Sequence, residues 1–338
     1  MTTTMADIAK LAGVSKATVS RVLNHRAEGV GPETRKRVEE LMERMEFAPC
    51  GVARGLATGK SRSVALVIPD VADPFFPLLI RGIEEALRRR GYGLFLCDSG
   101  QDIQKERANV RMILEQRVDG VILNPTLSDP DGQLDLLDKR AIPYVLLDRI
   151  LEGRNAGAGV YVDNRKGGRM AADLLLGGGA RRLLFINGPE ALSVCKLRRL
   201  GVEDACRERG LDPASILTGC GDYSVASGER VTDGFLGRGP VPPFDALFAA
   251  NDRMAIGAMR SLRKHGIPVP EAVEIVGFDD VEIARLVEPP LTTVAQPAFR
   301  MGRKSAELLL DLIDGRKPRR RTIIMEPELV LRGTTRPR

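Results

Sequence analysis

The chain has 338 residues, a length that exceeds one typical domain and suits two or three. With 43% hydrophobic and 28% charged residues it has the composition of an ordinary globular protein, and no apolar run reaches the roughly 18 residues that a membrane-spanning helix needs. The net charge of +6 is modest, and the N-terminus lacks the apolar stretch of a secretory signal, so we expect a cytoplasmic protein without a membrane partner.

Residues 5–24 predict two short helices joined by a tight turn. Gly13 can adopt the left-handed conformation that ends a helix, and Ser15 can cap the helix that follows. The apolar faces of the two helices are expected to comprise Ile8, Leu11, Ala12, Val19, Val22 and Leu23. The second helix presents small and basic residues outward, which is typical of a helix-turn-helix that fits the DNA major groove. An ordinary helical hairpin is the alternative.

A third helix is predicted at Pro32–Arg44, because proline and Glu33 both suit the first helical turn. Residues 50–62 are rich in glycine and in small or polar side chains, and they indicate a linker. A short helical pattern within it, at 52–56, is weakened by Gly55 and should not be stable alone.

From Ser63 onward, apolar strand patterns alternate with amphipathic helix patterns. Strands are predicted at 64–68, 93–97, 121–123, 144–147, 183–186, 246–248 and 274–278. Helices are predicted at 78–89, 106–116, 168–176, 199–209 and 253–265. Continuous apolar strands separated by helices indicate an α/β fold with parallel sheets covered on both faces, and the length favours two lobes over one sheet.

Polar residues follow several of the predicted strands, which indicates a ligand cleft beyond the carboxyl ends of the sheets. They are Asp70, Asp73, Asp148, Arg149, Asn187, Asn251, Asp252, Asp279 and Asp280. An Asp or Asn in such a position is also an ordinary helix cap, and Asp252 is expected to cap the helix that follows it.

The sequence carries no pattern of catalytic, metal-ligating or cofactor-binding residues. Its scattered cysteines predict buried reduced thiols, and they are Cys50, Cys97, Cys195, Cys206 and Cys220. Neither a GxSxG elbow nor a GxxxxGK[ST] loop occurs, and residues 157–159 (Gly-Ala-Gly) lack the third glycine of a dinucleotide fingerprint, so we interpret them as a flexible loop. The basic run at 316–321 is interpreted as a solvated loop without a function. We therefore expect no enzyme, no metal and no cofactor.

Ordered motifs along the chain carry a family resemblance. They include MADIAKLAGVSKATVSRVLN from Met5, PETRKRVEELMERMEFAP from Pro32, VARGLATGKS from Val52, DPFF from Asp73, VDNRKGG from Val162, INGP from Ile186, GDYSVASG from Gly221, AAND from Ala249, VGFDD from Val276 and PPLTTVAQP from Pro289. With these motifs the chain resembles the LacI/GalR family of bacterial transcriptional repressors over nearly its full length.

The resemblance implies an all-α helix-turn-helix headpiece, a hinge and a core similar to periplasmic sugar-binding proteins. The core would have two Rossmann-like lobes, each with a parallel sheet. The expected bounds are 1–48 for the headpiece, 49–62 for the hinge helix or linker and 63–338 for the core, with an N-lobe of about 63–161 and 290–321 and a C-lobe of about 162–289 and 322–338.

The resemblance assigns DNA contacts to Ser15, Lys16, Ala17, Thr18, Ser20, Arg21, Asn24, Val52, Ala53 and Leu56. Arg21 is expected to read a guanine, Ala17 to meet a thymine methyl group or leave space, and Lys16 to contact a base or a phosphate. The polar residues Thr18, Ser20 and Asn24 would contact phosphates. Leu56 would wedge into the central minor groove, unless it packs as a linker leucine on its own core.

The resemblance assigns effector contacts to Phe75, Phe76, Asp148, Arg198, Tyr223, Asn251 and Asp279. Tyr223 would stack on a sugar or base ring, while Arg198 and Asp279 would donate to and accept from its hydroxyl groups. One of the two phenylalanines can instead belong to the N-lobe core. Asp73 stands where the family frequently has asparagine, so a hydrogen-bond donor is lost at that position.

The implied partners are a palindromic double-stranded DNA operator, a small-molecule effector and a second copy of the chain. A sugar is favoured as the effector, with a nucleobase as the alternative, and the effector is expected to release a repressor from DNA at the nucleoid. The last residues lack leucine heptads, so we expect a homodimer. Two other classes are a sugar-binding transport protein with the same core, against which the headpiece argues, and an α/β enzyme, which no catalytic pattern supports.

Overall fold

A computed structural model describes residues 3–23, 29–47, 60–126, 132–151, 157–237 and 241–337. The chain divides into two compact units, Met1–Ser61 and Arg62–Arg338. Among the helices of the described ranges, none combines the length and the apolar composition that crossing a membrane would require.

The first unit is a three-helix headpiece, with α1 at Met5–Ala12, α2 at Lys16–Leu23 and α3 at Pro32–Arg44. The turn between α1 and α2 forms as predicted: Gly13 has φ of 66°, and the Ser15 hydroxyl oxygen accepts a hydrogen bond from the Thr18 amide at 3.1 Å. Thr4 caps α1, since its side chain accepts from the Asp7 amide while the Asp7 carboxylate accepts from the Thr4 amide.

The three helices enclose a small apolar core. Its buried members are Ile8, Ala9, Ala12, Val19, Val22, Val38 and Leu41. Leu11 was expected in this core, and that prediction was wrong, because 55% of its surface is exposed. The buried side of α1 is centred between Ile8, Ala9 and Ala12, and at about 100° per residue Leu11 lies on the flank of the helix.

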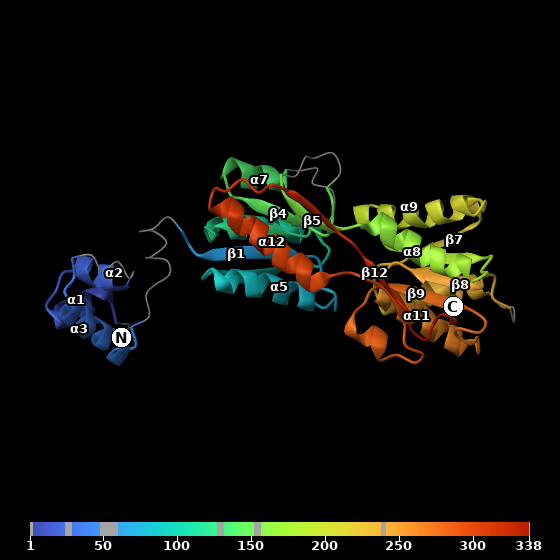
Figure 1. The fold of residues 1–338 in the computed structure, drawn as a ribbon, viewed down its shortest axis with the longest axis horizontal. Helices are drawn as coiled ribbons and strands as arrows, with labels where there is room; N and C mark the ends of the chain where they lie inside the picture. The colour runs from blue at the N-terminus through green and yellow to red at the C-terminus, as the bar shows by residue number, and fades with distance from the viewer. Residues whose placement is uncertain are drawn as a thin grey trace. The chain divides into compact units, whose positions relative to one another are not determined.

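The first sheet of the second unit consists of six parallel strands in the order β11-β5-β4-β3-β1-β2. Their bounds are β1 Ser63–Ile68, β2 Gly93–Asp98, β3 Gly120–Leu123, β4 Tyr144–Leu147, β5 Gly159–Val162 and β11 Thr322–Met325. Helices cover both faces, and they are α5 Phe76–Arg89, α6 Ile103–Glu115, α7 Gln133–Lys139 and α12 Ala298–Ile313 (Figure 1). We call this layered body the N-lobe.

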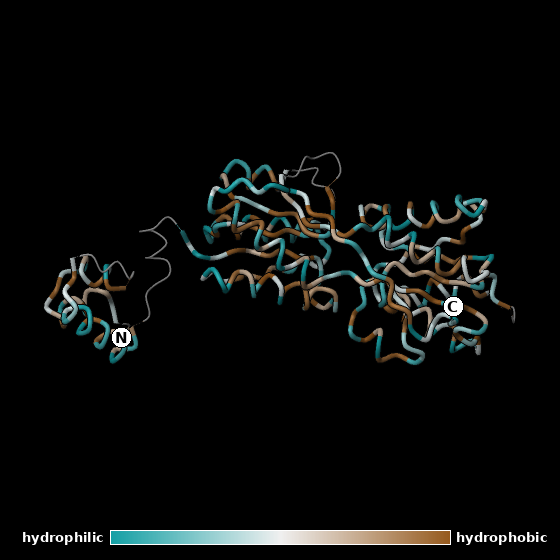
Figure 2. The backbone as a smooth tube through the Cα atoms, viewed as in Figure 1, coloured by the Kyte–Doolittle hydropathy of each residue, from teal (hydrophilic) through white to brown (hydrophobic). Residues whose placement is uncertain are grey.

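Strand β1 shows how the two faces of this sheet are packed. Its even-numbered residues 64, 66 and 68 are buried in one apolar cluster with α5 and α12, and residues 65 and 67 are buried in another with α6. A central parallel strand therefore has to be apolar at every position, as predicted. Figure 2 shows the hydrophobic strands between more hydrophilic helix surfaces.

The second sheet has the order β12-β10-β9-β8-β6-β7, with β12 antiparallel to β10 and all other neighbours parallel. The strand bounds are β6 Leu183–Asn187, β7 Leu217–Cys220, β8 Ala246–Ala249, β9 Glu274–Asp279, β10 Thr292–Ala295 and β12 Glu328–Val330. The helices are α8 Asn164–Gly177, α9 Ser193–Glu208, α10 Val225–Leu236 and α11 Asp252–Lys264, with short 3₁₀ turns η1 Pro213–Ser215 and η2 Glu282–Arg285. We call this body the C-lobe.

Helices α8 and α9 approach each other so closely that glycine is needed in both. A Cβ atom on Gly168 would lie 2.2 Å from the Arg198 carbonyl oxygen, and one on Gly201 would lie 2.0 Å from the Arg165 carbonyl oxygen. These contacts explain the glycines in two otherwise regular helices, where glycine by itself costs roughly 0.5–1 kcal/mol relative to alanine.

The chain crosses between the sheets three times, after β5, after β10 and after β11. The expected lobe bounds were wrong at two strands: β10 lies in the C-lobe sheet and β11 lies in the N-lobe sheet. Strand β10 begins with Thr292 and Thr293, which are fully buried although polar, so its sequence has no continuous apolar run. The prediction of a loop at 157–159 was also wrong for its last residue, because Gly159 begins β5.

The cap of α11 and the exposure of one cysteine also differ from the predictions. Asn251, not Asp252, caps α11, because its side chain accepts from the Met254 amide while Asp252 is already inside the helix. Among the cysteines in the described ranges, Cys97, Cys195 and Cys206 are buried as expected, whereas Cys220 is exposed.

Candidate functional site

The exposed side of α2 carries the residues expected to meet DNA. Lys16, Ala17 and Arg21 are exposed, and Ser20 is half-buried. Ser15 and Thr18 also lie at the start of this helix, where their hydroxyl oxygens are 3.0 Å apart. The capping role of Ser15 thus holds the N-terminus of α2 in a fixed conformation. The remaining expected DNA contacts, Asn24, Val52, Ala53 and Leu56, lie outside the described residues.

A cavity between the two lobes is bordered by all the residues that were expected to bind an effector. Phe75 and Phe76 come from the start of α5 and Asp148 follows β4 in the N-lobe. Arg198 on α9, Tyr223 before α10, Asn251 before α11 and Asp279 at the end of β9 come from the C-lobe. Six segments that are distant in the sequence therefore meet at one place. The cavity measures about 50 Å³.

Arg198 is buried and held by its own lobe. Its Nε donates to Asn164 Oδ1 at 2.8 Å, and its Nη1 donates to the Ala250 carbonyl oxygen. The guanidinium carbon also lies 3.7 Å from the centre of the Phe278 ring, which is the geometry of a cation–π contact. The plane of the guanidinium is thus fixed by three neighbours from three separate segments.

Three carboxylates of the cavity have raised pKa values. Burial raises the pKa of Asp73, Asp148 and Asp279, because a charged carboxylate loses hydration there. The positive charge of Arg198 acts in the opposite direction and lowers the pKa values of Asp148 and Asp279. Asp279 also accepts a hydrogen bond from Gln296 Nε2 at 2.7 Å. Acidic groups that are buried beside arginines provide strong acceptors and donors for a polar ligand.

The backbone is strained at the cavity. Among residues with positive φ, Gln101 at 58°, Asp148 at 65°, Tyr223 at 69° and Asp279 at 110° all border it. Residues other than glycine adopt such values infrequently and at an energetic cost, and residues in such conformations often cluster at functional sites. The strain supports a functional role for these positions independently of any sequence motif.

Tyr223 and Asn251 are more constrained than their expected roles suggest. The Tyr223 hydroxyl lies 2.8 Å from Cys195 Sγ, and its carbonyl oxygen accepts a hydrogen bond from Asn251 Nδ2 at 3.1 Å. Because Asn251 Oδ1 also accepts from the Met254 amide, both polar ends of Asn251 already hold the protein together. Asn251 therefore positions Tyr223 and α11 in addition to bordering the cavity.

Two further polar residues lie near the cavity and were not expected from the sequence. Gln296 borders it directly, and the buried Asn124 donates to Asp148 Oδ2 at 3.3 Å. Their Oε1 and Oδ1 atoms are buried without a hydrogen-bond partner in the structure, as are Asp148 Oδ1 and Arg149 Nε. Buried polar atoms normally have partners, so these atoms are suited to meet a ligand. Both residues directly follow a strand, and this placement could have identified them.

Ion pairs join the two lobes beside the cavity. Arg253 Nη1, at the start of α11, lies 3.5 Å from both Asp70 Oδ2 and Asp73 Oδ2, which follow β1. A hydrogen bond from the Ile150 amide to Ser193 Oγ, 2.9 Å long, also connects the lobes. Asp73 thus supplies a carboxylate to an interlobe ion pair where an asparagine would not.

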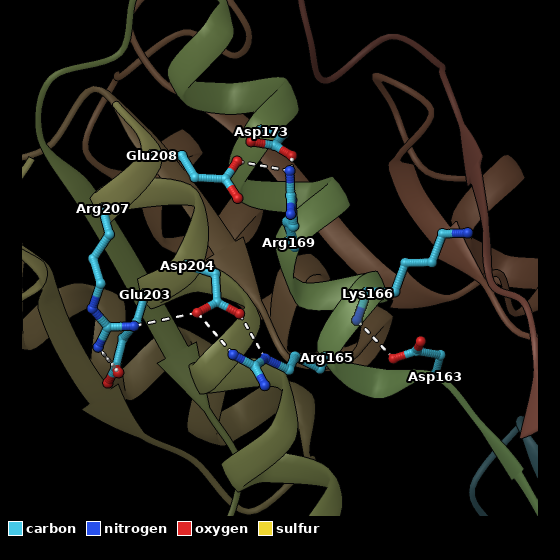
Figure 3. Close-up of polar contacts among 9 residues, drawn as sticks. All are labelled: Asp163, Arg165, Lys166, Arg169, Asp173, Glu203, Asp204, Arg207 and Glu208. Carbon is cyan, nitrogen blue, oxygen red and sulfur yellow. Dashed lines mark hydrogen bonds and ion pairs between the residues drawn. The ribbon is translucent and has the colours of Figure 1, made fainter. Parts of the chain in front are cut away.

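A wider hollow on the surface of α8 and α9 is a weaker candidate for a ligand site, although its volume is about 740 Å³. Its charged groups already pair with one another, as Figure 3 shows. Arg165 binds both oxygens of Asp204 at 2.6 and 3.0 Å, and Arg169 reaches Glu208 at 2.7 Å. Hydrogen bonding from Arg165 lowers the pKa of Asp204. We interpret this hollow as a solvated network of ion pairs between two helices.

Comparisons with known proteins agree with this division into a headpiece and a two-lobe core. Residues 4–50 match the family described as bacterial regulatory proteins, lacI family, and residues 172–335 match the periplasmic binding protein-like domain. The HTH-type transcriptional repressor PurR of Aliivibrio fischeri (strain MJ11) is 34% identical over 336 residues, which cover 98% of each chain.

Two solved structures also resemble the chain. The lac repressor dimer bound to operator and the anti-inducer ONPF has a TM-score of 0.88 and 29% identity, with 99% of each chain covered. A complex of the transcriptional regulator CelR with cellobiose has a TM-score of 0.75 and 33% identity, covering 98% of this chain and 99% of that one.

Proposed function

The chain belongs to the lacI family of bacterial regulatory proteins, and from this premise we propose that it is a transcriptional repressor that binds a palindromic operator as a dimer and responds to a small molecule held between its lobes. One observation carries the proposal: the residues expected to contact an effector surround a single interlobe cavity, in a chain whose headpiece presents a basic helix. Its place of action is the nucleoid in the cytoplasm, and we assign it no enzymatic activity.

In the proposed operator complex, α2 lies in the major groove. Arg21 reads a guanine through its O6 and N7 atoms, and Ala17 leaves room for a thymine methyl group. Lys16 contacts a base or a phosphate, and Thr18 and Ser20 contact phosphates. The exposure of Lys16, Ala17 and Arg21 supports these roles. Leu56 of each subunit enters the minor groove at the centre of the operator.

For the effector we propose a sugar or a sugar derivative. The carboxylates of Asp73, Asp148 and Asp279 can accept hydrogen bonds from hydroxyl groups, and the guanidinium of Arg198 can donate to them. The CelR complex, whose ligand is cellobiose, supports this class. A nucleobase is the second candidate, because the aromatic side chains that border the cavity offer rings for stacking.

We propose that effector binding changes the arrangement of the lobes. The cavity of about 50 Å³ is far smaller than the roughly 300–1,000 Å³ of typical small-molecule sites. A sugar can enter only if the lobes or their side chains move apart, so it must favour an arrangement different from this one. Such a shift of population couples effector binding to DNA affinity, and we propose that the effector releases the operator.

The proposal can be tested with the purified full-length protein. The protein would first select duplexes from a random pool, and a panel of sugars and nucleosides would be screened for an increase in its melting temperature. We expect a palindromic duplex to be selected, and a stabilising sugar to weaken binding to that duplex. Failure to enrich any duplex would contradict the repressor function, and stabilisation by nucleosides alone would favour the second effector class.

Substitutions at the cavity should separate operator binding from the response to the effector. Asp279→Asn retains the size of the side chain but removes one acceptor of the proposed sugar, and Arg198→Ala removes a donor. Both variants should bind the selected operator like the parent protein and lose its response to the effector, as measured by fluorescence anisotropy with increasing sugar. An unchanged sugar response in both variants would remove these residues from the site.

A further inference from the structure

One edge of the N-lobe is strongly basic, and the proposed function leaves it unexplained. It consists of Arg62 and the turns at residues 88–92, 115–119, 138–143 and 314–321, which lead into five of the six strands of the sheet. We call this surface the basic edge. These segments contain twelve Lys or Arg and four Asp or Glu, although the net charge of the whole chain is only +6.

The topology brings these turns together. All six strands are parallel, so the turns that precede them lie along the same edge of the sheet. Side chains join neighbouring turns: Arg62 Nη1 donates to the Arg90 carbonyl oxygen at 3.2 Å, and Arg90 Nη2 lies 2.6 Å from Asp314 Oδ2. The Gly159 amide donates to the Arg321 carbonyl oxygen at 2.8 Å.

The opposite edge of the same sheet has the opposite charge. The residues at or just after the strand ends there include Asp70, Asp73, Asp98, Asp102 and Asp148, with Arg149 as the basic exception. The N-lobe is thus polarised, with an acidic edge at the effector cavity and a basic edge at the end where its chain begins, at Arg62.

Helix capping accounts for only part of the basic edge. Arg88 and Arg89 lie at the end of α5, where cations stabilise the helix dipole, and each pairs with a glutamate one turn earlier. The side chains of Arg319, Arg320 and Arg321 are different. They follow α12 by several residues, they are exposed, and no residue in the described part of the chain forms an ion pair with them.

We propose that the basic edge binds the phosphate backbone of the DNA that flanks the operator. The inference rests on the proposed operator binding, because the chain connects the headpiece to this edge at Arg62. A six-stranded edge extends about 25 Å at the usual strand spacing. Along a duplex, that length carries roughly 15 phosphates. The surface reads no sequence; it adds affinity and holds the core near the duplex.

The test compares a triple variant, Arg319→Gln/Arg320→Gln/Arg321→Gln, with a control that loses the same charge on the C-lobe. The control, Arg181→Gln/Arg199→Gln/Arg207→Gln, also changes three exposed arginines. Binding of the full-length proteins would be measured over a range of salt concentrations on three duplexes: the selected operator with long flanks, the operator trimmed to its half-sites, and a long unrelated duplex.

On the two long duplexes the triple variant should bind at least about tenfold more weakly than the parent. The slope of log affinity against log salt should become shallower by about 5, because each subunit of the proposed dimer loses three arginines. The control should keep the parental slope. On the trimmed operator, parent and triple variant should differ little. Equal slopes for the triple variant and the control would overturn the proposal and favour a partner such as an acidic protein or an anionic membrane. If no operator is selected, the proposed function fails, while the unrelated duplex still decides the role of the basic edge.

Discussion

Among the exposed residues of α2, Arg21 is the strongest candidate for distinguishing bases. A guanidinium can form two parallel hydrogen bonds with guanine, which neither Ala17 nor a serine can do. Arg21→Ala should therefore cost about 1–3 kcal/mol on the selected operator and relax the preference at one base pair. Competition binding against operators with single base changes measures both effects. Equal weakening on every sequence would identify Arg21 as a phosphate contact.

Asp252 should make stability depend on pH. Its carboxylate is fully buried and accepts hydrogen bonds from the Thr293 hydroxyl and the Val281 amide. Burial raises its pKa from 3.8 to about 7, so the folded state binds this proton more tightly than the unfolded state. The stabilising contribution is complete below pH 3.8 and is lost as the pH rises towards 7.

Unfolding by urea at a series of pH values tests this assignment. The free energy of unfolding should fall between pH 5 and pH 7 with a slope of up to about 1.4 kcal/mol per pH unit from this group. Asp252→Asn should remove that part of the slope even if the variant is less stable overall. The same slope in parent and variant would assign the titration to other carboxylates.

At the cavity, motifs predicted the participating residues better than their detailed roles. Phe75 in DPFF, Tyr223 in GDYSVASG and Asp279 in VGFDD come from separate motifs, and each borders the same cavity. What the motifs could not indicate was the network around them. The hydrogen bond between Tyr223 and Cys195, and the one that Asn251 donates to the Tyr223 carbonyl oxygen, depend on contacts between segments that are distant in the sequence.

At the scale of elements, α8 and α9 provide a prediction about packing. A Cβ atom on Gly201 would lie 2.0 Å from the Arg165 carbonyl oxygen, which is backbone and cannot turn aside. Gly201→Ala should therefore destabilise the protein by roughly 1–3 kcal/mol. Gly234 in α10 is the matched control, since a Cβ there meets nothing within 4 Å.

Gly234→Ala should be neutral or stabilise the protein by up to about 1 kcal/mol, because alanine favours the helix. Thermal and urea unfolding of both variants provide the comparison. Similar effects of the two substitutions would mean that α8 and α9 can separate at little cost. Helix propensity alone would then determine the change in stability.

Periodicity predicted the elements with the strongest hydrophobic patterns. Strand β4 and helix α3 have the predicted bounds, and the predicted helix at 78–89 differs from α5 by two residues at its start. The pattern was weakest at β10 and β11, where buried threonines or exposed isoleucine replace continuous apolar runs. Their sheet membership is decided by long-range pairing, with β9 and β5 respectively, which local sequence does not encode.

At the scale of the whole core, Arg253 is placed to hold the lobes together. It pairs with Asp70 and Asp73, two residues of the N-lobe that border the cavity, and about a quarter of its side chain is exposed. Arg253→Gln should loosen this arrangement, because the amide keeps some hydrogen bonding but loses the charge. Hydrogen exchange at residues 69–76 should become faster, and the effector should bind more tightly, since less energy is needed to part the lobes.

Arg260→Gln serves as the control for this experiment. Arg260 lies on the same helix, but its partner Glu229 belongs to the same lobe. This variant should leave both hydrogen exchange near the cavity and effector affinity unchanged. If Arg253→Gln behaves in the same way, the ion pairs contribute nothing to the interlobe arrangement, as is common for partly exposed pairs.

The three crossings between the sheets determine how this protein can be dissected genetically. The N-lobe needs β11 and α12 from the last part of the chain, and the C-lobe needs β12, which lies after them. A fragment such as 172–335, the span matched by the periplasmic binding protein-like domain, would carry α12 without the partner face of α5 and would begin inside α8. Neither lobe can therefore be expressed as one continuous segment, and a chimaera that exchanges a lobe with a relative requires three splice junctions. The headpiece, by contrast, can be exchanged at a single junction before residue 62.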